Sequence, residues 1–302
     1  MTNDALARVA VTRETADRSR PGSRPGSRPG SRPGSRPGSR PGGVAHKAWQ
    51  LALHAGLRAL PWLIVLFLWY LLPATGLVNT ALVPTPWQVL VKFYEQLTTN
   101  RLWLDMYMSL QRVTLGLACG IVLAVPIGFL LGWYRPARTL FDPLVNFFRS
   151  LPPIALIPLV IVYFGIDELA KVVMLFYAAF FSGVIVMYEG IVQTNPLFIR
   201  VARTLGATDD EIFRRIIIPL ALPHVLTALR VALGVSWATL VASELIAAQR
   251  GLGAVIQNAS NYFQIDTIYA GIICIGLLAL LMDRCLRVIA ARLLQWQERI
   301  VP

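Results

Sequence analysis

The residues that could do chemistry are few and widely scattered. The histidines His46, His54 and His224 lack metal-ligand spacing, and no G-x-x-x-x-G-K-[ST] phosphate loop occurs in the sequence. No serine stands in a nucleophile elbow of the G-x-S-x-G kind. We therefore expect no metal site, no cofactor and no ATP hydrolysis in this chain, which is not predicted to be an enzyme.

Three charged residues within apolar stretches are the candidates that remain: Glu244, Arg230 and Arg149. An isolated carboxylate in such a setting is costly unless it is paired or wet. A carboxylate would also repel an anion, so a structural or gating role for Glu244, paired with Arg250 or with a partner subunit, is favoured over solute binding. Arg230 and Arg149 are the positive candidates for an anion route, although Arg149 can reach the membrane interface from a helix end.

Polar and helix-breaking residues accompany these charges. Ser236, Trp237 and Thr239 provide hydroxyl groups and an indole donor near Glu244, as a low-affinity lining would. Prolines remove backbone donors, which a bilayer tolerates only where neighbouring helices or water satisfy the freed carbonyls. The helix they interrupt should face the bundle interior, either as a moving wall or as a merely kinked packing helix. The predicted translocation pathway comprises Pro152, Pro153, Ser236, Trp237, Thr239 and Glu244.

The composition is that of a membrane protein. Of 302 residues, 56% are hydrophobic and only 15% are charged, which excludes most soluble enzymes. The net charge of +12 would suggest nucleic acid in a soluble protein, but here it is better explained by orientation in a membrane, and we expect no nucleic-acid partner. The three cysteines lie in apolar stretches and are predicted to be small buried hydrophobes.

The first 58 residues are expected to form a disordered basic arm. They contain 11 bases and 3 acids, and residues 20–42 include six copies of Arg-Pro-Gly. A segment without apolar side chains cannot offset the loss of its conformational entropy on folding. The arm either lies against anionic membrane lipid or is an expanded repeat without a role.

Residues 59–302 form the predicted membrane domain, an all-α bundle of six transmembrane helices. Crossing the hydrocarbon core takes roughly 20 helical residues, and six intervals of suitable length and hydrophobicity occur. Within the second of them, the Gly116-x-x-x-Gly120 step permits close helix packing. The intervals are 60–78, 113–134, 140–165, 168–192, 219–246 and 267–282, the last continuing toward Leu294.

The positions of the bases indicate the orientation, because Lys and Arg beside spans stay cytoplasmic. With the N-terminus inside, 21 bases fall on the cytoplasmic side and 4 outside. Without the first 58 residues, the count is still 10 against 4. Both termini are therefore predicted to be cytoplasmic.

The longest cytoplasmic loop after the arm, residues 193–219, is the most informative segment. Leu197, Val201 and Leu205 recur every four residues, so they share one face of a short helix that should end at Gly206. Thr208 and Glu211 have the spacing of a capping box and should open a second helix. The apolar face either packs under the bundle or is covered by a soluble partner.

Residues 201–206 (VARTLG), followed after nine residues by 216–219 (IIIP), resemble the signature loop of ATP-binding-cassette (ABC) importer permeases, E-A-A-x-x-x-G then I-x-L-P. Arg200, Val201 and Ile218 depart from that pattern. The resemblance implies that the loop is a coupling helix docking on a cytoplasmic ATPase subunit, and Arg200 removes the usual Glu from that contact. The implied coupling residues are Leu197, Arg200, Val201, Ala202, Arg203, Thr204, Leu205, Gly206 and Ala207.

Two further blocks extend the resemblance over about residues 104–297. Residues 149–159 with 163–166 are similar to the third span of the nitrate, sulfonate and taurine branch, and 237–248 with 250–253 resemble taurine permeases. This implies a type I ABC importer permease in a bacterial inner membrane, moving an organosulfonate such as taurine. The implied partners are a second permease copy, two ATPase subunits and an external solute-binding protein.

Other solutes and mechanisms stay open at this point. Nitrate, bicarbonate, another aliphatic sulfonate or a pyrimidine precursor would leave much the same permease sequence. An ATP-independent secondary transporter or channel should carry paired intramembrane charges and an inverted repeat, neither of which is clear here. An assembly scaffold without transport would leave the broken third span unexplained.

Overall fold

The computed structural model describes residues 43–76, 82–99 and 101–295. The chain divides into two units, Met1–Arg58 and Ala59–Pro302. The Arg-Pro-Gly copies lie outside the described residues. The predicted disorder extended to residue 58, whereas helix α1, Gly43–Ala74, begins directly after the last copy. Residues 43–58 are helical because the sequence from Val44 onward is rich in Ala and Leu, which favour helix. The boundary of the basic arm at residue 58 stays a prediction.

All regular elements of the described residues are helical, in agreement with the predicted all-α fold. Between α9 and the preceding short helix, a π-helical turn continues the same rod. After α1 the elements are α2 Pro86–Thr98, α3 Arg101–Trp133, α4 Arg135–Ser150, α5 Pro153–Phe164, α6 Glu168–Val192, α7 Pro196–Thr204, α8 Asp209–Ile212, η1 Phe213–Ile217, α9 Ile218–Ala247, α10 Leu252–Asn261 and α11 Ile265–Leu293.

Four helical stretches of the described residues are long and apolar enough to cross a membrane. They are α3, α6, the continuous rod Asp209–Ile246 and α11, and a fifth span results if α4 and α5 are counted as one bent pair. The apolar part of α1, Ala59–Ala74, is shorter than these. The number of six transmembrane helices therefore stays a prediction.

The third predicted span is broken at its prolines. Helices α4 and α5 meet at an angle of 92°, and the two residues between them, Leu151 and Pro152, have extended backbones. Prolines impose this because each lacks an N–H and disfavours helical geometry in the preceding residue. The Tyr177 hydroxyl of α6 donates to the Phe148 carbonyl, which holds the end of α4 against the bundle.

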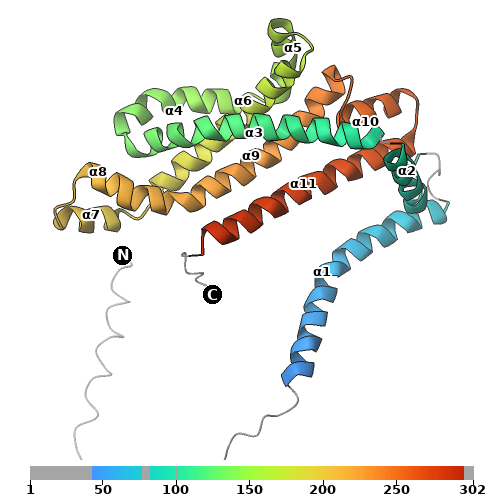
Figure 1. The fold of residues 1–302 in the computed structure, drawn as a ribbon, viewed down its shortest axis with the longest axis horizontal. Helices are drawn as coiled ribbons and strands as arrows, with labels where there is room; N and C mark the ends of the chain where they lie inside the picture. Colours follow the sequence, from blue (N-terminus) through green and yellow to red (C-terminus); the bar gives the residue numbers. More distant parts are fainter. Residues whose placement is uncertain (1–42, 77–81, 100, 296–302) are drawn as a thin grey trace, which may run out of the picture. The chain divides into compact units, whose positions relative to one another are not determined.

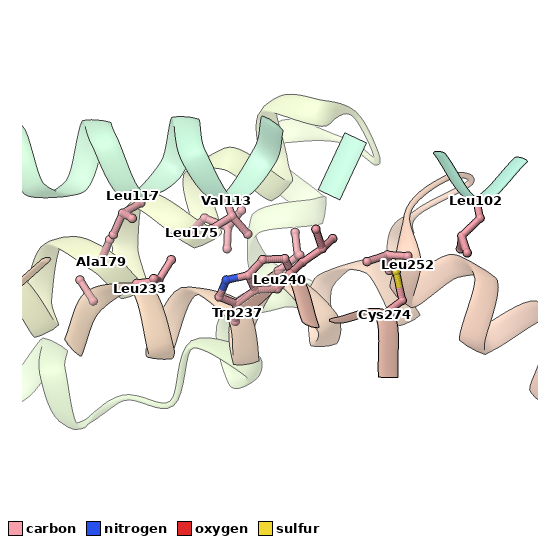
Figure 2. Packing of buried hydrophobic residues seen from close by; sticks show 12 residues of the cluster. Leu102, Val113, Leu117, Leu175, Ala179, Leu233, Trp237, Leu240, Leu252 and Cys274 are labelled. Atoms are coloured by element: carbon pink, nitrogen blue, oxygen red, sulfur yellow. The ribbon is translucent and has the colours of Figure 1, made fainter. Parts of the chain in front are cut away.

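Helices α3, α6 and α9 pack together as the centre of the membrane domain (Figure 1). Glycines of α3 allow the contact with α6: a Cβ on Gly116 would lie 2.3 Å from the Cβ of Leu175, and one on Gly128 would lie 2.4 Å from that of Met187. Gly116 therefore serves the close packing predicted for it. Figure 2 shows Leu175 close to Trp237 of α9 within the buried cluster.

The cysteine prediction holds for one residue of three. Cys274 is buried in the cluster of Figure 2, but Cys119 and Cys285 are exposed. An apolar stretch of a membrane helix has an outward face as well as an inward one, so composition alone does not identify the buried positions.

Candidate functional site

Helix α7 begins and ends at local signals in the sequence. The Asn195 side chain accepts a hydrogen bond from the backbone N–H of Leu197 at 2.9 Å, and Pro196 occupies the first turn. At the other end Gly206 has a φ of +84°, and the N–H of Ala207 donates to the carbonyl of Ala202 at 3.0 Å. This positive φ is the conformation that favours glycine, so the predicted turn is confirmed.

The next turn of chain opens α8 with the predicted capping box. The backbone N–H of Glu211 donates to the Thr208 hydroxyl, and the backbone N–H of Thr208 donates to the Glu211 carboxylate at 3.1 Å. From there α8 continues through η1 into α9. The loop therefore leads directly into a membrane-spanning helical stretch, Asp209–Ile246.

The two faces of α7 have different surroundings. Ala202 is buried and Ile199 is partly buried in a hydrophobic cluster with residues of α6, η1 and α9. The apolar stripe Leu197, Val201 and Leu205 is exposed, by 58%, 49% and 82% respectively. Of the two alternatives for this stripe, packing under the bundle is therefore excluded among the described residues, and a surface that a partner could cover remains.

The polar residues of the predicted coupling set lie around this stripe. Arg203 pairs with Asp209 at 3.0 Å across the Gly206 turn, and the Thr204 hydroxyl donates to the Val201 carbonyl at 2.8 Å. Arg200 is exposed at the position where the resembled family has Glu. Together with the stripe, these residues give α7 an outward surface that is apolar in the middle and basic at its edge.

The predicted pathway residues of α9 lie inside the bundle. Ser236, Trp237 and Thr239 are buried, with exposed fractions of 0%, 5% and 3%. The Thr239 hydroxyl donates to the carbonyl of Val235, four residues earlier. The Ser236 hydroxyl and the Trp237 indole nitrogen have no hydrogen-bond partner among the described residues. In this structure these side chains do not line an open route.

Glu244 is also buried, and its partner is Arg112 of α3. The Nη1 group of Arg112 donates to Glu244 Oε1 at 2.6 Å, the Ser109 hydroxyl donates to the same oxygen at 2.8 Å, and the backbone N–H of Gly253 donates to Oε2 at 2.8 Å. The predicted pairing with Arg250 is wrong: Arg250 contributes its backbone carbonyl, which accepts from Arg112 at 2.8 Å. A guanidinium has enough donors to serve both groups.

The same guanidinium continues the network to α6. Arg112 donates through Nε and Nη2 to the two oxygens of Glu168, at 2.5 and 2.7 Å, and the Lys171 ammonium donates to Glu168 at 2.8 Å. Sequence reasoning missed Arg112 as the partner of Glu244, and missed Glu168 and Lys171 as the further members of this network. The available signal was their position: each lies within or at the end of an apolar interval, where an unpaired charge is costly.

Glycines bring the chain between α9 and α10 close to this ion pair. A Cβ on Gly251, whose φ is +124°, would lie 2.5 Å from Glu244 Oε1 and 2.6 Å from Arg112 Nη1. The N–H of Gly251 donates to Asp105 at 2.9 Å, and that of Leu252 donates to Ser109 at 2.9 Å. Because these glycines lack a Cβ, the connection between α9 and α10 can lie directly against the Arg112–Glu244 pair.

Helices α4 and α5, which are joined at Pro152 and Pro153, do not face the bundle interior as predicted. Of the α5 residues only Ile157 is buried, while Val162 and Tyr163 are 78% and 75% exposed. The expectation that this helix faces the interior is therefore wrong for the single chain. The 92° bend turns most of α5 away from the other helices, so its apolar side chains have no cover within the described residues.

The two arginines named for an anion route lie in different places. Arg149 is exposed in the last turn of α4. Arg230 is partly exposed on α9 and donates to Asp283 of α11 at 3.0 Å. Only Arg230 therefore lies within a long spanning helix.

A protein-family model described as the binding-protein-dependent transport system inner membrane component matches residues 116–295. The chain belongs to this family. It is 46% identical over 244 residues to a probable ABC transporter permease protein of Brucella abortus (strain 2308), covering 81% of this chain and 96% of the relative. It is 34% identical over 242 residues to the taurine transport system permease protein TauC of Escherichia coli (strain K12), covering 78% and 88%.

The fold has a counterpart among solved structures. The chain matches one of the MetNI methionine ABC transporter in an inward-facing conformation, with a TM-score of 0.53 and 22% identity over 67% of this chain and 98% of that chain. The chain is accordingly a multi-pass inner-membrane permease subunit of an ABC importer, of the nitrate, sulfonate and taurine branch. Such subunits are not enzymes themselves, and the family implies an ATPase subunit and a solute-binding protein as partners.

Proposed function

We propose that this chain carries a small organosulfonate such as taurine into the cytoplasm, driven by ATP hydrolysis in its partner subunits. The relative named as a taurine permease supports this solute class. Exposed positive charge within a spanning helix, at Arg230, suits a solute that bears a sulfonate group.

The observation that carries the proposal is the two-faced helix α7. Docking to an ATPase subunit would remove its exposed leucine and valine side chains from water. This burial is favourable in proportion to the apolar area buried. Its other face is fixed to α6 and α9 through Ala202 and Ile199. A displacement of α7 by the ATPase would therefore reach the spanning helices. We assign coupling to Leu197, Arg200, Val201, Ala202, Arg203, Thr204, Leu205, Gly206 and Ala207.

We further propose six transmembrane helices with both termini in the cytoplasm, and a complex of two permease copies with two ATPase subunits and one external binding protein. The exposed apolar side chains of α5, such as Val162 and Tyr163, support a second permease copy as their cover. The basic flanks of the spans support the orientation. In residues 1–58, which we assign to a separate basic arm, Arg side chains would favour anionic membrane lipid.

The solute pathway in this proposal opens during the transport cycle. Pro152 and Pro153 join α4 to α5 and would form part of a moving wall. The hydroxyl of Ser236 and the indole nitrogen of Trp237 lack partners here, and an opening beside them would supply water or solute as one. Thr239 and Glu244 lie one and two turns further along α9, with Glu244 as the structural or gating residue.

Uptake in proteoliposomes tests the proposal. The permease is reconstituted with its ATPase subunit and binding protein, and ATP-dependent accumulation of radiolabelled taurine is measured. Gly206→Val should keep ATP hydrolysis but lose uptake, because the positive φ of Gly206 is unfavourable for a branched side chain. Gly165→Val is the matched control, since Gly165 has a φ of +75° and open space around it, away from α7. Normal uptake by a stable Gly206→Val variant would contradict the coupling mechanism.

A further inference from the structure

Three charged side chains form a cluster between α9 and α11. Arg230 donates through Nε to Asp283 Oδ1 at 3.0 Å, and Arg287 donates through Nη2 to Asp283 Oδ2 at 2.9 Å. One carboxylate thus serves two guanidinium groups. The cluster, which we define as Arg230, Asp283 and Arg287, therefore keeps a net positive charge.

The cluster lies toward one end of the spans: Asp283 directly follows the predicted interval 267–282, and Arg287 is among the bases counted on the cytoplasmic side. Arg230 stands twelve residues after Ile218, about 18 Å along α9 at the rise of an α-helix. Asp283 stands ten residues before Leu293, about 15 Å from the end of α11. Charged residues near the end of a span are placed where water can reach them, because hydrocarbon solvates them poorly.

The side chains of this cluster are partly exposed. Their exposed fractions are 45% for Arg230, 48% for Arg287 and 27% for Asp283. The exposed face of α9 continues for two turns through Gly234 and Ala238, and a Cβ on Gly234 would meet no atom within 4 Å. Small residues thus leave room beside Arg230 for a small molecule.

Arg230 also retains donors for a ligand. Among the described residues its Nε is the only one of its nitrogens with a hydrogen-bond partner. The terminal amino groups of a guanidinium present further N–H donors in a planar fork that suits oxyanions. Competition from Asp283 for the same cation keeps such binding weak, which a solute in transit requires.

We propose that this cluster is an anion-binding step of the solute route, and that Arg230 there receives the sulfonate oxygens of the solute. The inference rests on the proposed function and names the chemical group by which the permease itself selects the solute. Selection is for a singly charged oxyanion group of small size, because only one positive charge is uncompensated. The cluster lies on the exposed face of α9, and the buried face that carries Ser236 and Thr239 joins the route only when the bundle opens.

The test compares charge variants in the reconstituted complex. The readout is the initial rate of radiolabelled taurine uptake with saturating loaded binding protein, with ATP hydrolysis measured in parallel. Arg230→Gln should lower uptake about tenfold while ATP hydrolysis continues, since it removes the charged donors. Arg230→Lys should restore uptake to within about threefold of the original chain, because it keeps the charge. Asp283→Asn should retain uptake, although it breaks the same ion pair.

The outcomes separate this inference from a structural ion pair. Equal losses in Arg230→Gln and Asp283→Asn, or unchanged uptake in Arg230→Gln, would overturn it. Thermal melting shows whether each variant is folded; if Arg230→Gln is not, Arg287→Gln replaces it, with a reduced uptake rate expected and an unchanged rate overturning the inference. Absence of taurine uptake by the original chain would instead contradict the proposed function, so the two failures are distinguishable.

Discussion

Arg112 on α3 lies with its Nη1 group 2.6 Å from the Oε1 atom of Glu244 on α9, and both side chains are buried. The opposite edge of the same guanidinium is bidentate to Glu168 at the start of α6. One side chain therefore joins the three central helices at the end remote from α7. If an ATPase subunit moves α7, it acts on a bundle whose opposite end is held together by these ion pairs. The helices are therefore expected to rearrange mainly near α7.

The first prediction concerns the stability of this pair. Arg112→Met should lower the free energy of unfolding by about 3–5 kcal/mol, because it leaves the Glu244 carboxylate buried without its cation. Replacing both residues by methionine should recover much of that loss, since no unpaired charge remains. Thermal melting in detergent ranks the stabilities of the original chain, the Arg112→Met variant and the double methionine variant.

Arg214→Met is the matched control for this experiment. Arg214 pairs with Asp210 at 3.0 Å, but both side chains are largely exposed, at 72% and 66%. Its loss should change stability by less than about 1 kcal/mol. Equal effects of Arg112→Met and Arg214→Met would contradict the structural role of the buried pair.

The second prediction concerns Gly251. Gly251→Ala should be destabilising by about 3 kcal/mol or more, because its Cβ would lie 2.5 Å from Glu244 Oε1 in a backbone conformation that is already unfavourable for alanine. Gly165→Ala has a comparable φ of +75° and no atom near its Cβ, so only backbone strain of about 1 kcal/mol is expected. Similar melting temperatures for the two variants would show that the close approach is unimportant.

Local features of the fold could be predicted from the sequence. The interval 168–192 coincides with α6 because charged or polar residues bound a continuous apolar run. The turn at Gly206 and the capping box at Thr208 are satisfied by neighbours a few residues away, so spacing alone identified them. The prolines also marked the break in the third span, but the angle of 92° depends on tertiary packing and could not be read from them.

The candidate site was less predictable because its contacts are distant in sequence. The prediction offered Glu244 either Arg250, six positions away, or a partner subunit as its counter-charge, whereas its partner Arg112 is 132 positions away in the same chain. Periodicity placed Ser236 and Thr239 on one face, and both are indeed buried. It could not show whether that face meets solute or protein, since either environment favours small polar residues on a membrane helix.

The third prediction concerns the contact between α3 and α6. Gly128→Ala should lower stability by about 1–3 kcal/mol, because the new methyl group would lie 2.4 Å from the Cβ of Met187 and must push the helices apart. Gly276→Ala on α11 has open space and should be neutral or slightly stabilising, since alanine favours helix. Melting temperatures measured under one detergent condition compare them, and a neutral Gly128→Ala would contradict the close packing.

The fourth prediction separates the two faces of α7. Leu205→Ser on the exposed face should leave the melting temperature of the permease unchanged but weaken its association with the ATPase subunit at least about fivefold, because apolar contact area is lost. Ile199→Ser on the packed face should do the reverse and lower the melting temperature, because it places a hydroxyl in the hydrophobic cluster beside Ala202. Co-purification with the ATPase subunit and thermal melting are measured on the same preparations. If Leu205→Ser binds the ATPase as tightly as the original chain, the exposed stripe is not the docking surface, and force must enter the bundle elsewhere.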